Sequence, residues 1–385
     1  MNARAPVLDI DGFVRIRRDF HVHPELSCEE ARTSETIARL LSAWGYEVHA
    51  GIGGHGVVGL LRGGHGSKCV AIRADFDALP IEEETGLPYA SKYRGKMHAC
   101  GHDGHTAILL AAAHAMAENP VADGTFAAVF QPAEELGHGA KAMFEAGLLE
   151  RFGFDAVFGL HNIPGMSAGT LGFRAGPFWA AVDNLDVEVQ GFGGHGGLPQ
   201  LARDPLVAGA QMVLAFQTIV SRNTDPLDAA VVTLGAFHSG KAHNVIPDTA
   251  TLAVNVRSFT PAVREATLKR IEEITTRLAG AMQVDAAVKR LRGTPAVVND
   301  PAMTHFARNV ARGLFGADKV RDDVRPMSVS DDFSEFLARR PGSYIVIGNG
   351  EQSFPLHHPK YDFNDDLIAP AAAYWSRLVS EYLGR

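Results

Sequence analysis

Short apolar runs alternate with helical patterns in the first and last parts of the chain. The runs are rich in β-branched and aromatic residues and lie at 57–61, 69–76, 126–131, 156–160 and 343–348. Such continuous apolarity is typical of strands that are buried on both faces. The Ala- and Leu-rich segments 105–119 and 140–150 between them predict helices. This alternation indicates a layered α/β domain with a largely parallel central sheet.

The middle of the chain has a different pattern. Its strand-like segments alternate apolar with polar residues, which is typical of strands with one face toward water. The expected order is strand, helix, strand, strand, helix, strand, at 185–190, 204–223, 229–237, 249–257, 261–280 and 283–291. This order is that of a ferredoxin-like α+β domain. Gly and Pro near both of its ends predict a catalytic domain over 1–178 and 293–385 that carries an inserted domain over 179–292.

Composition and charge narrow the class of protein. The 385 residues are 46% hydrophobic and 21% charged, an ordinary globular composition for a chain of two domains. The 36 Lys and Arg residues against 44 Asp and Glu residues give a net charge of −8 without a basic block. We therefore expect no nucleic-acid partner and a small-molecule substrate.

The chain has no apolar run that approaches the roughly 20 residues needed to span a bilayer. Residues 1–13 also lack the apolar stretch of a secretory signal. The 3 cysteines, Cys28, Cys69 and Cys100, are too few for a disulfide framework. These features predict a cytoplasmic protein without a membrane partner.

Two familiar motifs lack the context that their function requires. Gly51, Gly53 and Gly56 match the dinucleotide fingerprint, but a strand pattern follows them where a helix is needed. The segment 165–169 matches the nucleophile elbow of serine hydrolases, yet no helix follows it either. We therefore predict a glycine-rich hairpin turn at the first motif and no nucleophilic role for Ser167.

Side chains that can bind metal follow the predicted strands of the α/β domain. They are Asp75, Asp77, Glu134, Glu135, His161, His357 and His358. Because the active site of an open α/β sheet forms outside the carboxyl ends of its strands, these groups can converge. His98, Cys100, His102 and His105 add a further set just before a predicted helix. Thiolate, imidazole and carboxylate together suit Zn²⁺ or another borderline divalent ion.

Each of these residues has an ordinary structural explanation when it is taken alone. A single His161 is a satisfied polar residue, a single Cys100 is a small buried one, and an acidic pair is a solvated helix start. Their position at successive strand ends favours a metal site instead. The adjacent Glu134 and Glu135 suit a metallohydrolase, because one can bind metal while the other takes a proton from the attacking water. A shared Cys100 thiolate can bridge two ions about 3.5–4 Å apart.

Several segments carry His, Gly, Pro and acidic residues in a distinctive order. They are RRDFHVHPELSCEE, ADFDALPIEEETGLPYAS, HACGHDGHTA, FQPAEE, GLHN, GGHGGLP, HNVIPD and LHHPKYDFND. In this order they resemble the metal-dependent amidohydrolases of the aminoacylase, hippurate hydrolase and plant auxin-conjugate hydrolase type. The resemblance covers nearly the full length of the chain. It implies a metallopeptidase-type catalytic domain and an inserted ferredoxin-like lid that mediates dimers.

The resemblance also implies an activity and its cofactors. The expected reaction is hydrolysis of the amide bond of N-acyl-L-amino acids, with an N-acetyl, N-benzoyl or similar acyl group, to a carboxylic acid and a free amino acid. The expected cofactors are two divalent ions per chain, Zn²⁺ or Mn²⁺, with Co²⁺ or Ni²⁺ as alternatives. The expected assembly is a homodimer or a dimer of dimers.

Ligand roles follow from the same resemblance. One ion would be held by Cys100, Glu135 and His357, and the other by Cys100, His102 and His161. In related branches a histidine ligand stands where this chain has Asp75, and His102 takes its place here. His138 is a candidate for an extra ligand, and the choice between His357 and its neighbour His358 depends on the resemblance alone.

The implied catalytic and substrate-binding residues lie in both domains. Glu134 would be the general base, and Asp77 would orient a metal ligand. In the lid, His195 would stabilise the oxyanion in a neighbouring active site, whereas Asn244 and Arg257 would hold the substrate carboxylate.

Other readings of the sequence stay open. Leu136, His138 and Asp331 depart from the usual pattern and put the shape of the pocket in doubt. Phe178 and Trp179 suit either an acyl pocket or packing at the domain crossing. The same metal centre would also suit a dipeptidase or an aromatic-amine deaminase. A rival of another class is a dimeric binding protein without catalytic activity.

Overall fold

The computed structural model describes residues 9–322 and 324–384, which form two compact units. The first unit runs to Gly176, includes Val298–Arg325 and resumes at Asp332, and the second comprises Pro177–Val297 and Pro326–Asp331. The segment 326–331, which the sequence analysis assigned to the catalytic domain, therefore belongs to the second unit. Residues 1–8, which carry part of the argument about a secretory signal, lie outside the described residues.

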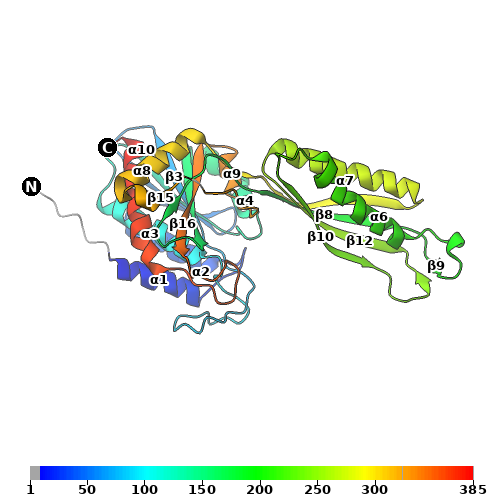
Figure 1. Ribbon diagram of the computed structural model, residues 1–385. Coiled ribbons are helices and arrows are strands. Elements are labelled where there is room, and N and C mark those ends of the chain that lie inside the picture. The colour runs from blue at the N-terminus through cyan, green and yellow to red at the C-terminus, as the bar shows by residue number, and fades with distance from the viewer. Residues whose placement is uncertain (1–8, 323, 385) are drawn as a thin grey trace, which may run out of the picture. The chain divides into compact units, whose positions relative to one another are not determined.

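The first unit is built on a sheet whose strand order, within the described residues, is β1-β2-β4-β3-β5-β16-β6-β15 (Figure 1). The strands are β1 Glu47–Ile52, β2 Gly56–Gly63, β3 Cys69–Asp75, β4 Gly124–Gln131, β5 Ala156–Pro164, β6 Leu171–Gly172, β15 Val320–Arg321 and β16 Gly342–Gly350. The central strands β4, β3, β5 and β16 are parallel, whereas β1 and β2 form an antiparallel edge. The largely parallel α/β sheet predicted from the apolar runs is confirmed.

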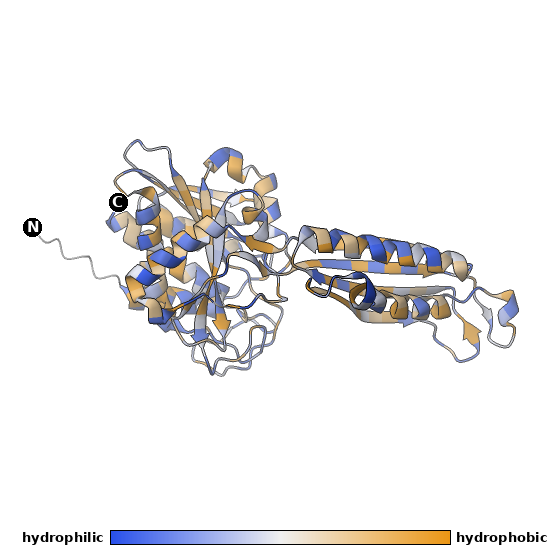
Figure 2. Ribbon diagram, turned by 45° about the horizontal axis from the view of Figure 1, so that its top comes forward, coloured by the Kyte–Doolittle hydropathy of each residue, from blue (hydrophilic) through white to orange (hydrophobic). Residues whose placement is uncertain are grey.

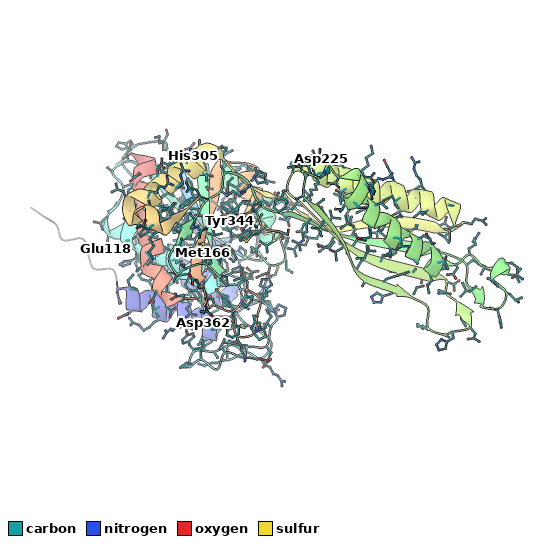
Figure 3. All side chains as sticks on the ribbon, viewed as in Figure 1. Glu118, Met166, Asp225, His305, Tyr344 and Asp362 are labelled. Atoms are coloured by element: carbon teal, nitrogen blue, oxygen red, sulfur yellow. The ribbon has the colours of Figure 1, made fainter. Side chains whose placement is uncertain are left out.

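Helices cover both faces of this sheet. They are α1 Ile10–Val22, α2 Ala31–Ala43, α3 His102–Glu118, α4 Gly139–Glu145, α5 Leu148–Phe152, α8 Pro301–Phe315, α9 Ser334–Leu337 and α10 Ile368–Leu383. Side chains alternate along β16, so Ile345 and Ile347 join the hydrophobic core that also contains residues of α3, α8 and α10. Tyr344 points the other way, stacks on Phe333, and lies in the interior of the first unit (Figure 3).

One predicted helix is split in the structure, whereas the predictions for the two rejected motifs are confirmed. The segment 140–150 forms two short helices, α4 and α5, because Gly147 between them adopts a φ of +83° that ends the helical path. The predicted hairpin is confirmed, since β1 and β2 pair antiparallel around Gly53. No helix follows Ser167, as predicted, because β6 begins at Leu171. No helix in the described ranges is long and apolar enough to cross a membrane.

The second unit has a ferredoxin-like topology. Its main elements are β8 Ala181–Gln190, α6 Pro205–Thr218, β10 Ala230–Ser239, β12 Thr249–Ser258, α7 Pro261–Ala281 and β13 Asp285–Thr294. The sheet order β10-β12-β8-β13 is antiparallel throughout. Figure 2 shows the alternation of hydrophobic and hydrophilic residues along these elements. One face of the sheet packs Val187, Leu252 and Val254 against the two helices.

Short elements complete the second unit and the crossings. β9 Gly194–His195 and β11 Val245–Ile246 form a small antiparallel ribbon. β7 Gly176–Trp179 and β14 Val297–Asn299 lie where the chain crosses between the units. Phe178 and Trp179 are 0% and 3% exposed and contact each other, which favours packing over an open acyl pocket.

Three long helices begin with the same local signal. Asp204, Thr260 and Asp300 cap α6, α7 and α8, and each side chain accepts a hydrogen bond from a backbone N–H of the first turn. Pro follows each cap directly, where its fixed φ suits the helix and its missing N–H costs nothing. These helices therefore start where local chemistry alone would start them.

Candidate metal centre and active site

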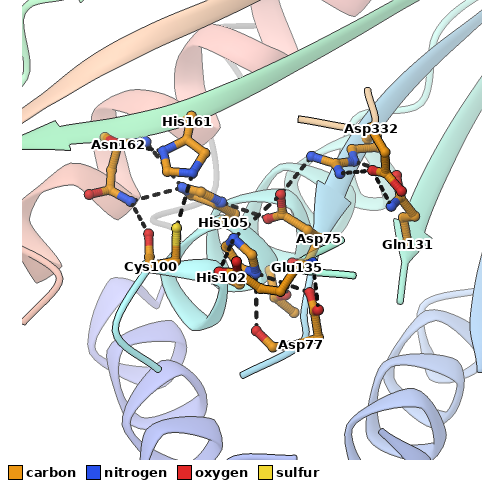
Figure 4. A network of polar contacts seen from close by, with 12 residues as sticks. Asp75, Asp77, Cys100, His102, His105, Gln131, Glu135, His161, Asn162 and Asp332 are labelled. Carbon is orange, nitrogen blue, oxygen red and sulfur yellow. Dashed lines mark hydrogen bonds and ion pairs between the residues drawn. The ribbon is translucent and has the colours of Figure 1, made fainter. Parts of the chain in front are cut away.

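The sequence-predicted metal ligands of the first unit lie together at the carboxyl edge of its sheet (Figure 4). Two groups of ligand atoms share the sulfur of Cys100, namely Cys100 with His102 and His161, and Cys100 with Glu135 and His357. Within each group the atoms lie within 4.8 Å of one another. The Cys100 Sγ to His161 Nε2 distance is 3.4 Å, and His357 Nε2 lies 3.5 Å from Glu135 Oε1.

Glu134 lies beside these groups. Its carboxylate, that of Glu135 and the His102 imidazole form a further group within the same 4.8 Å limit. The turn that presents both carboxylates follows β4 and places Ala133 at a φ of +51°. The carboxylate of the buried Glu30 accepts a hydrogen bond from the Ala133 backbone N–H at 2.8 Å. Glu30, which the sequence analysis did not select, thus holds the turn before the acidic pair.

Unusual backbone conformations shape the other two ligand segments. Gly101 precedes α3 with a φ of +90°, and a Cβ there would collide with Asn162 and Tyr361. Only glycine can therefore stand between Cys100 and His102. His357 has a φ of +65°, and its backbone N–H donates to the Ala99 carbonyl at 2.8 Å, so the histidine loop is tied to the cysteine loop.

Asp77 holds both His102 and the acidic turn. Its Oδ1 lies 3.1 Å from His102 Nδ1, while Oδ2 accepts hydrogen bonds from Ser27 Oγ at 2.6 Å and from the Glu135 N–H at 3.0 Å. Burial alone would raise the pKa of Asp77, but these donors lower it. The ionised carboxylate fixes His102 with Nε2 toward the other ligand atoms.

Asp75 and His105 belong to the same cluster but are already engaged. His105 Nε2 accepts the Asn162 backbone N–H at 3.1 Å, so the imidazole proton is on Nδ1, which donates to Asp75 Oδ1 at 2.7 Å. The second oxygen of Asp75 accepts from Arg73 Nη1 at 2.6 Å. Burial opposes ionisation of Asp75, but Arg73, His102 and His105 keep the pKa of its carboxyl well below the usual value. These two residues are therefore structural supports.

The remaining donor set suits divalent metal ions. Burial, and next the Glu135 carboxylate, raise the pKa of the Cys100 thiol well above its usual range, so a thiolate here requires a neighbouring cation. Burial lowers the pKa of His161 far below its usual value, which keeps the imidazole neutral, as a metal ligand must be. Nε2 of His102 is buried and makes no hydrogen bond with an oxygen of the described residues. Thiolate, imidazole and carboxylate together match the preference of borderline divalent ions.

The alternative histidines do not join these groups. The ring of His358 stacks on Phe354, and its Nδ1 accepts the Lys360 N–H at 3.0 Å. The exposed His138 precedes α4 and belongs to none of the ligand groups found among the described residues. The geometry therefore favours His357.

The other predicted site residues lie in the second unit. His195 is paired with Val245 in the β9–β11 ribbon, and Gly196 N donates to Asn244 O at 2.8 Å, so His195 and Asn244 are neighbours. The backbone N–H of Gly197 donates to His195 Nδ1 at 3.0 Å, which leaves the imidazole proton on Nε2. Arg257 lies on β12, where its Nε donates to Asn255 Oδ1 at 2.9 Å.

The structure adds residues that sequence reasoning missed. Arg73, Gln131 and Asp332 form a buried polar group beneath Asp75, with Arg73 Nε donating to Gln131 Oε1 at 2.8 Å and Gln131 Nε2 to Asp332 Oδ1 at 2.7 Å. Arg73 interrupts an otherwise apolar strand, which was a usable signal for a buried charged partner. Asn162, directly after His161, makes hydrogen bonds with Cys100, His105 and Tyr361, which its position in the sequence does not suggest.

Comparisons with known proteins agree with this geometry. The model of peptidase family M20/M25/M40 matches residues 71–381. A hippurate hydrolase of Campylobacter jejuni is 42% identical over 384 residues, which cover 100% of both chains. An N-acetyl-L-cysteine deacetylase of Bacillus subtilis is 41% identical over 363 residues, 94% of this chain and 86% of that one.

A solved structure extends the likeness to the fold. The crystal structure of a Bacillus subtilis protein, described as a dinuclear metal binding peptidase of the M20 family, matches with a TM-score of 0.85 and 32% identity over 97% of this chain and 98% of that chain. The family match and the fold match each cover most of the chain, and the family match includes the residues of the ligand groups. The chain therefore belongs to peptidase family M20/M25/M40 and is a metal-dependent amidohydrolase.

Proposed function

We propose that this enzyme hydrolyses the amide bond of N-acyl-L-amino acids and releases a carboxylic acid and a free amino acid. The observation that carries the proposal is the pair of ligand groups that share Cys100, with Glu134 beside them. The relatives support the substrate class, since one is named for a benzoyl amino acid and another for an acetyl amino acid.

The metal-binding roles form the first part of the proposal. Cys100, Glu135 and His357 would hold one divalent ion, and Cys100, His102 and His161 would hold the other. Zn²⁺ or Mn²⁺ are the expected ions. When bound, two such ions supply Lewis acidity that polarises the acyl carbonyl and makes water a stronger nucleophile.

Glu134 is the proposed general base. Its carboxylate takes a proton from the attacking water, whose oxygen forms the new bond to the acyl carbon, and then delivers that proton to the amide nitrogen as the C–N bond breaks. Glu134 is 8% exposed, so its carboxylate is largely shielded from bulk water. Its neighbour Glu135 has a different proposed role, that of a metal ligand with Cys100 and His357.

Residues of the second unit are the proposed partners of the substrate. Because the Gly197 N–H occupies Nδ1 of His195, the imidazole presents its Nε2–H as a hydrogen-bond donor. Such a donor suits the oxyanion that forms when water attacks the acyl carbon. Asn244 and Arg257 would bind the substrate carboxylate, and the proposed assembly is a homodimer.

The first test is a substrate panel on protein that has been stripped by chelator and reloaded with Zn²⁺, Mn²⁺ or Co²⁺. We expect hydrolysis of N-acetyl, N-benzoyl or indole-acetyl amino acids that vanishes on stripping and returns with metal. Dipeptides and aromatic amines in the same panel test the same metal centre on other C–N bonds. Cleavage of only those compounds would overturn the proposed substrate class.

The second test is the variant Glu134→Gln, which keeps the shape of the side chain and removes the base. We expect turnover to fall by roughly 10²–10⁴-fold while metal content stays at the wild-type level. Glu145→Gln, on the exposed end of α4, is the matched control and should retain full turnover. Near-normal turnover of Glu134→Gln would contradict the proposed role.

A further inference from the structure

We propose that Asn162 is a positioning residue that fixes the relative placement of Cys100 and His161. The inference rests on the proposed function, because it concerns the same ligand groups, and it adds a residue that binds neither metal nor substrate. Asn162 is 0% exposed and follows His161 on β5. The residue therefore acts on the site only through other protein groups.

Asn162 contacts both ligand segments directly. Its backbone carbonyl accepts a hydrogen bond from His161 Nδ1 at 2.7 Å, which turns Nε2 of that imidazole toward the Cys100 sulfur. Its side-chain Nδ2 donates to the Cys100 carbonyl at 2.7 Å. One residue thus fixes the orientation of the His161 ring and the position of the backbone at Cys100.

Asn162 is itself held from two sides. Its Oδ1 accepts a hydrogen bond from the buried Tyr361 hydroxyl at 2.7 Å, which fixes the orientation of the amide. Its backbone N–H and Nδ2 both lie 3.1 Å from Nε2 of His105. Since Asp75 holds the other nitrogen of His105 and Arg73 holds Asp75, the amide rests on a continuous chain of buried hydrogen bonds.

The chemistry of the amide is specific to this place. Asn162 donates to the Cys100 carbonyl through Nδ2 and accepts from the Tyr361 hydroxyl through Oδ1, so the amide supplies a donor and an acceptor on two separate atoms of one neutral group. Alanine would leave the Cys100 carbonyl and the Tyr361 hydroxyl without these partners. The ligand loop at Gly101 packs directly on the amide, so the loss would reach the sulfur through a short path.

The test compares two buried asparagines of the first unit. Asn162→Ala removes an amide beside the ligands, and Asn299→Ala removes an amide that also makes several buried hydrogen bonds, to Arg174 and Tyr344, in another part of the same unit. Each protein is stripped by chelator, checked for thermal unfolding, and titrated with Co²⁺. The absorption of the cobalt–thiolate bond reports Cys100 directly and does not depend on turnover.

We expect Asn162→Ala to weaken Co²⁺ binding by roughly 10–100-fold and to reduce the cobalt–thiolate absorption, as loss of groups that orient metal ligands does. Asn299→Ala should lose stability but keep both signals. Unchanged binding in Asn162→Ala, or an equal loss in Asn299→Ala, would overturn the inference. Absence of the absorption from the wild-type protein would instead overturn the proposed metal ligands together with the inference.

A milder variant keeps the test decisive if Asn162→Ala does not fold. Tyr361→Phe removes only the hydroxyl that orients the amide and leaves the ring in its buried place. We expect a smaller loss of Co²⁺ affinity, of several-fold. A second mild variant, Asn162→Ser, replaces the amide by a shorter hydroxyl and should also weaken Co²⁺ binding. Wild-type affinity and absorption in both Tyr361→Phe and Asn162→Ser would overturn the positioning role.

Discussion

At the scale of single residues, Asp77 shows how one carboxylate supports several parts of the site. It accepts hydrogen bonds from Ser27, from His102 and from the backbone of Glu135, so these three partners all act as donors. An amide in its place must turn its NH₂ group toward at least one of these donors. The requirement for an ionised acceptor at this position follows from the neighbours alone.

The variant Asp77→Asn should therefore bind metal more weakly. We expect a loss of roughly 10–100-fold in affinity, measured by metal titration of the stripped protein, since both His102 and the acidic turn lose their shared acceptor. Ser27→Ala, which removes a single donor from the same carboxylate, is the matched control and should have a smaller effect. Equal affinity of Asp77→Asn and the wild type would show that Asp77 does not orient the ligands.

The positions of ligand-type residues at strand ends predicted which residues meet, whereas their individual roles were predicted from the resemblance alone. Ligand-type residues at successive strand ends were sufficient to predict that Glu135 and His161 lie in one site, because strand ends converge at one edge of a parallel sheet. The resemblance already selected His102 over His105 as a ligand, but the physical reason needs coordinates, since it depends on which ring nitrogen of His105 meets Asn162 and which meets Asp75. A linear pattern does not contain the direction of a side chain.

At the scale of elements, α3 is buried on nearly all sides, and its buried residues are mostly apolar. It packs against β3, α1 and α10, and its glycine Gly104 faces the ring of Phe363. A Cβ at Gly104 would lie 2.4 Å from several atoms of that ring. The close approach of the ring thus depends on the absence of a side chain.

Two helical glycines should respond in opposite ways to alanine. Gly104→Ala should lower the free energy of unfolding by about 1–3 kcal/mol, because the buried ring must move. Gly313→Ala in α8, where a new Cβ meets nothing within 4 Å, should raise it by about 0.5–1 kcal/mol through better helix propensity. Urea unfolding of both variants checks the prediction. A Gly104→Ala protein whose free energy of unfolding equals that of the wild type would contradict it.

Most elements could be predicted from local pattern. Apolar runs located the strands of the central sheet, and Asp or Thr followed by Pro coincides with the starts of α6, α7 and α8. The break between α4 and α5 was missed, because Ala146 and Gly147 continue the apolar periodicity while the backbone of Gly147 turns left-handed. The apolar periodicity indicates which face of a helix is buried, but it does not indicate whether the helix is interrupted.

At the scale of the whole molecule, a buried ionic network ties distant segments of the first unit together. Arg17 on α1 lies 3.2 Å from Asp103 on α3 and 2.7 Å from Asp365 before α10. His21 Nδ1 lies 2.8 Å from Asp103, and its Nε2 lies 3.3 Å from Glu83. The network therefore joins both ends of the unit to the helix that carries His102.

This network should make the stability of the protein depend on pH. Burial alone would lower the pKa of His21, but Asp103 and Glu83 outweigh it and raise the pKa to about 9. A raised pKa means that the contribution, of about 3 kcal/mol, is fully present below the unfolded value of about 6.5 and is lost as the pH rises through about 9. Burial raises the pKa of the neighbouring Tyr89 to about 12, so Tyr89 does not titrate in this range.

Urea unfolding between pH 6 and pH 10 checks this prediction. We expect the free energy of unfolding of the wild-type protein to fall across this range, and His21→Gln, which keeps polar contacts without a titrating proton, to show a flatter profile. Parallel profiles for the two proteins would exclude His21 as the source of the pH dependence.

The order of elements along the chain also governs how the protein emerges during synthesis. β16 lies between β5 and β6 in the sheet, and α10, close to the C-terminus, packs on α3. The first unit therefore cannot complete its sheet, or bring His357 close to Cys100, until β16 and the residues up to α10 have left the ribosome. The second unit, whose main elements run without interruption from Ala181 to Thr294, can fold earlier. We therefore expect the second unit to fold first and the long-range pairing of β5 with β16 to form after it.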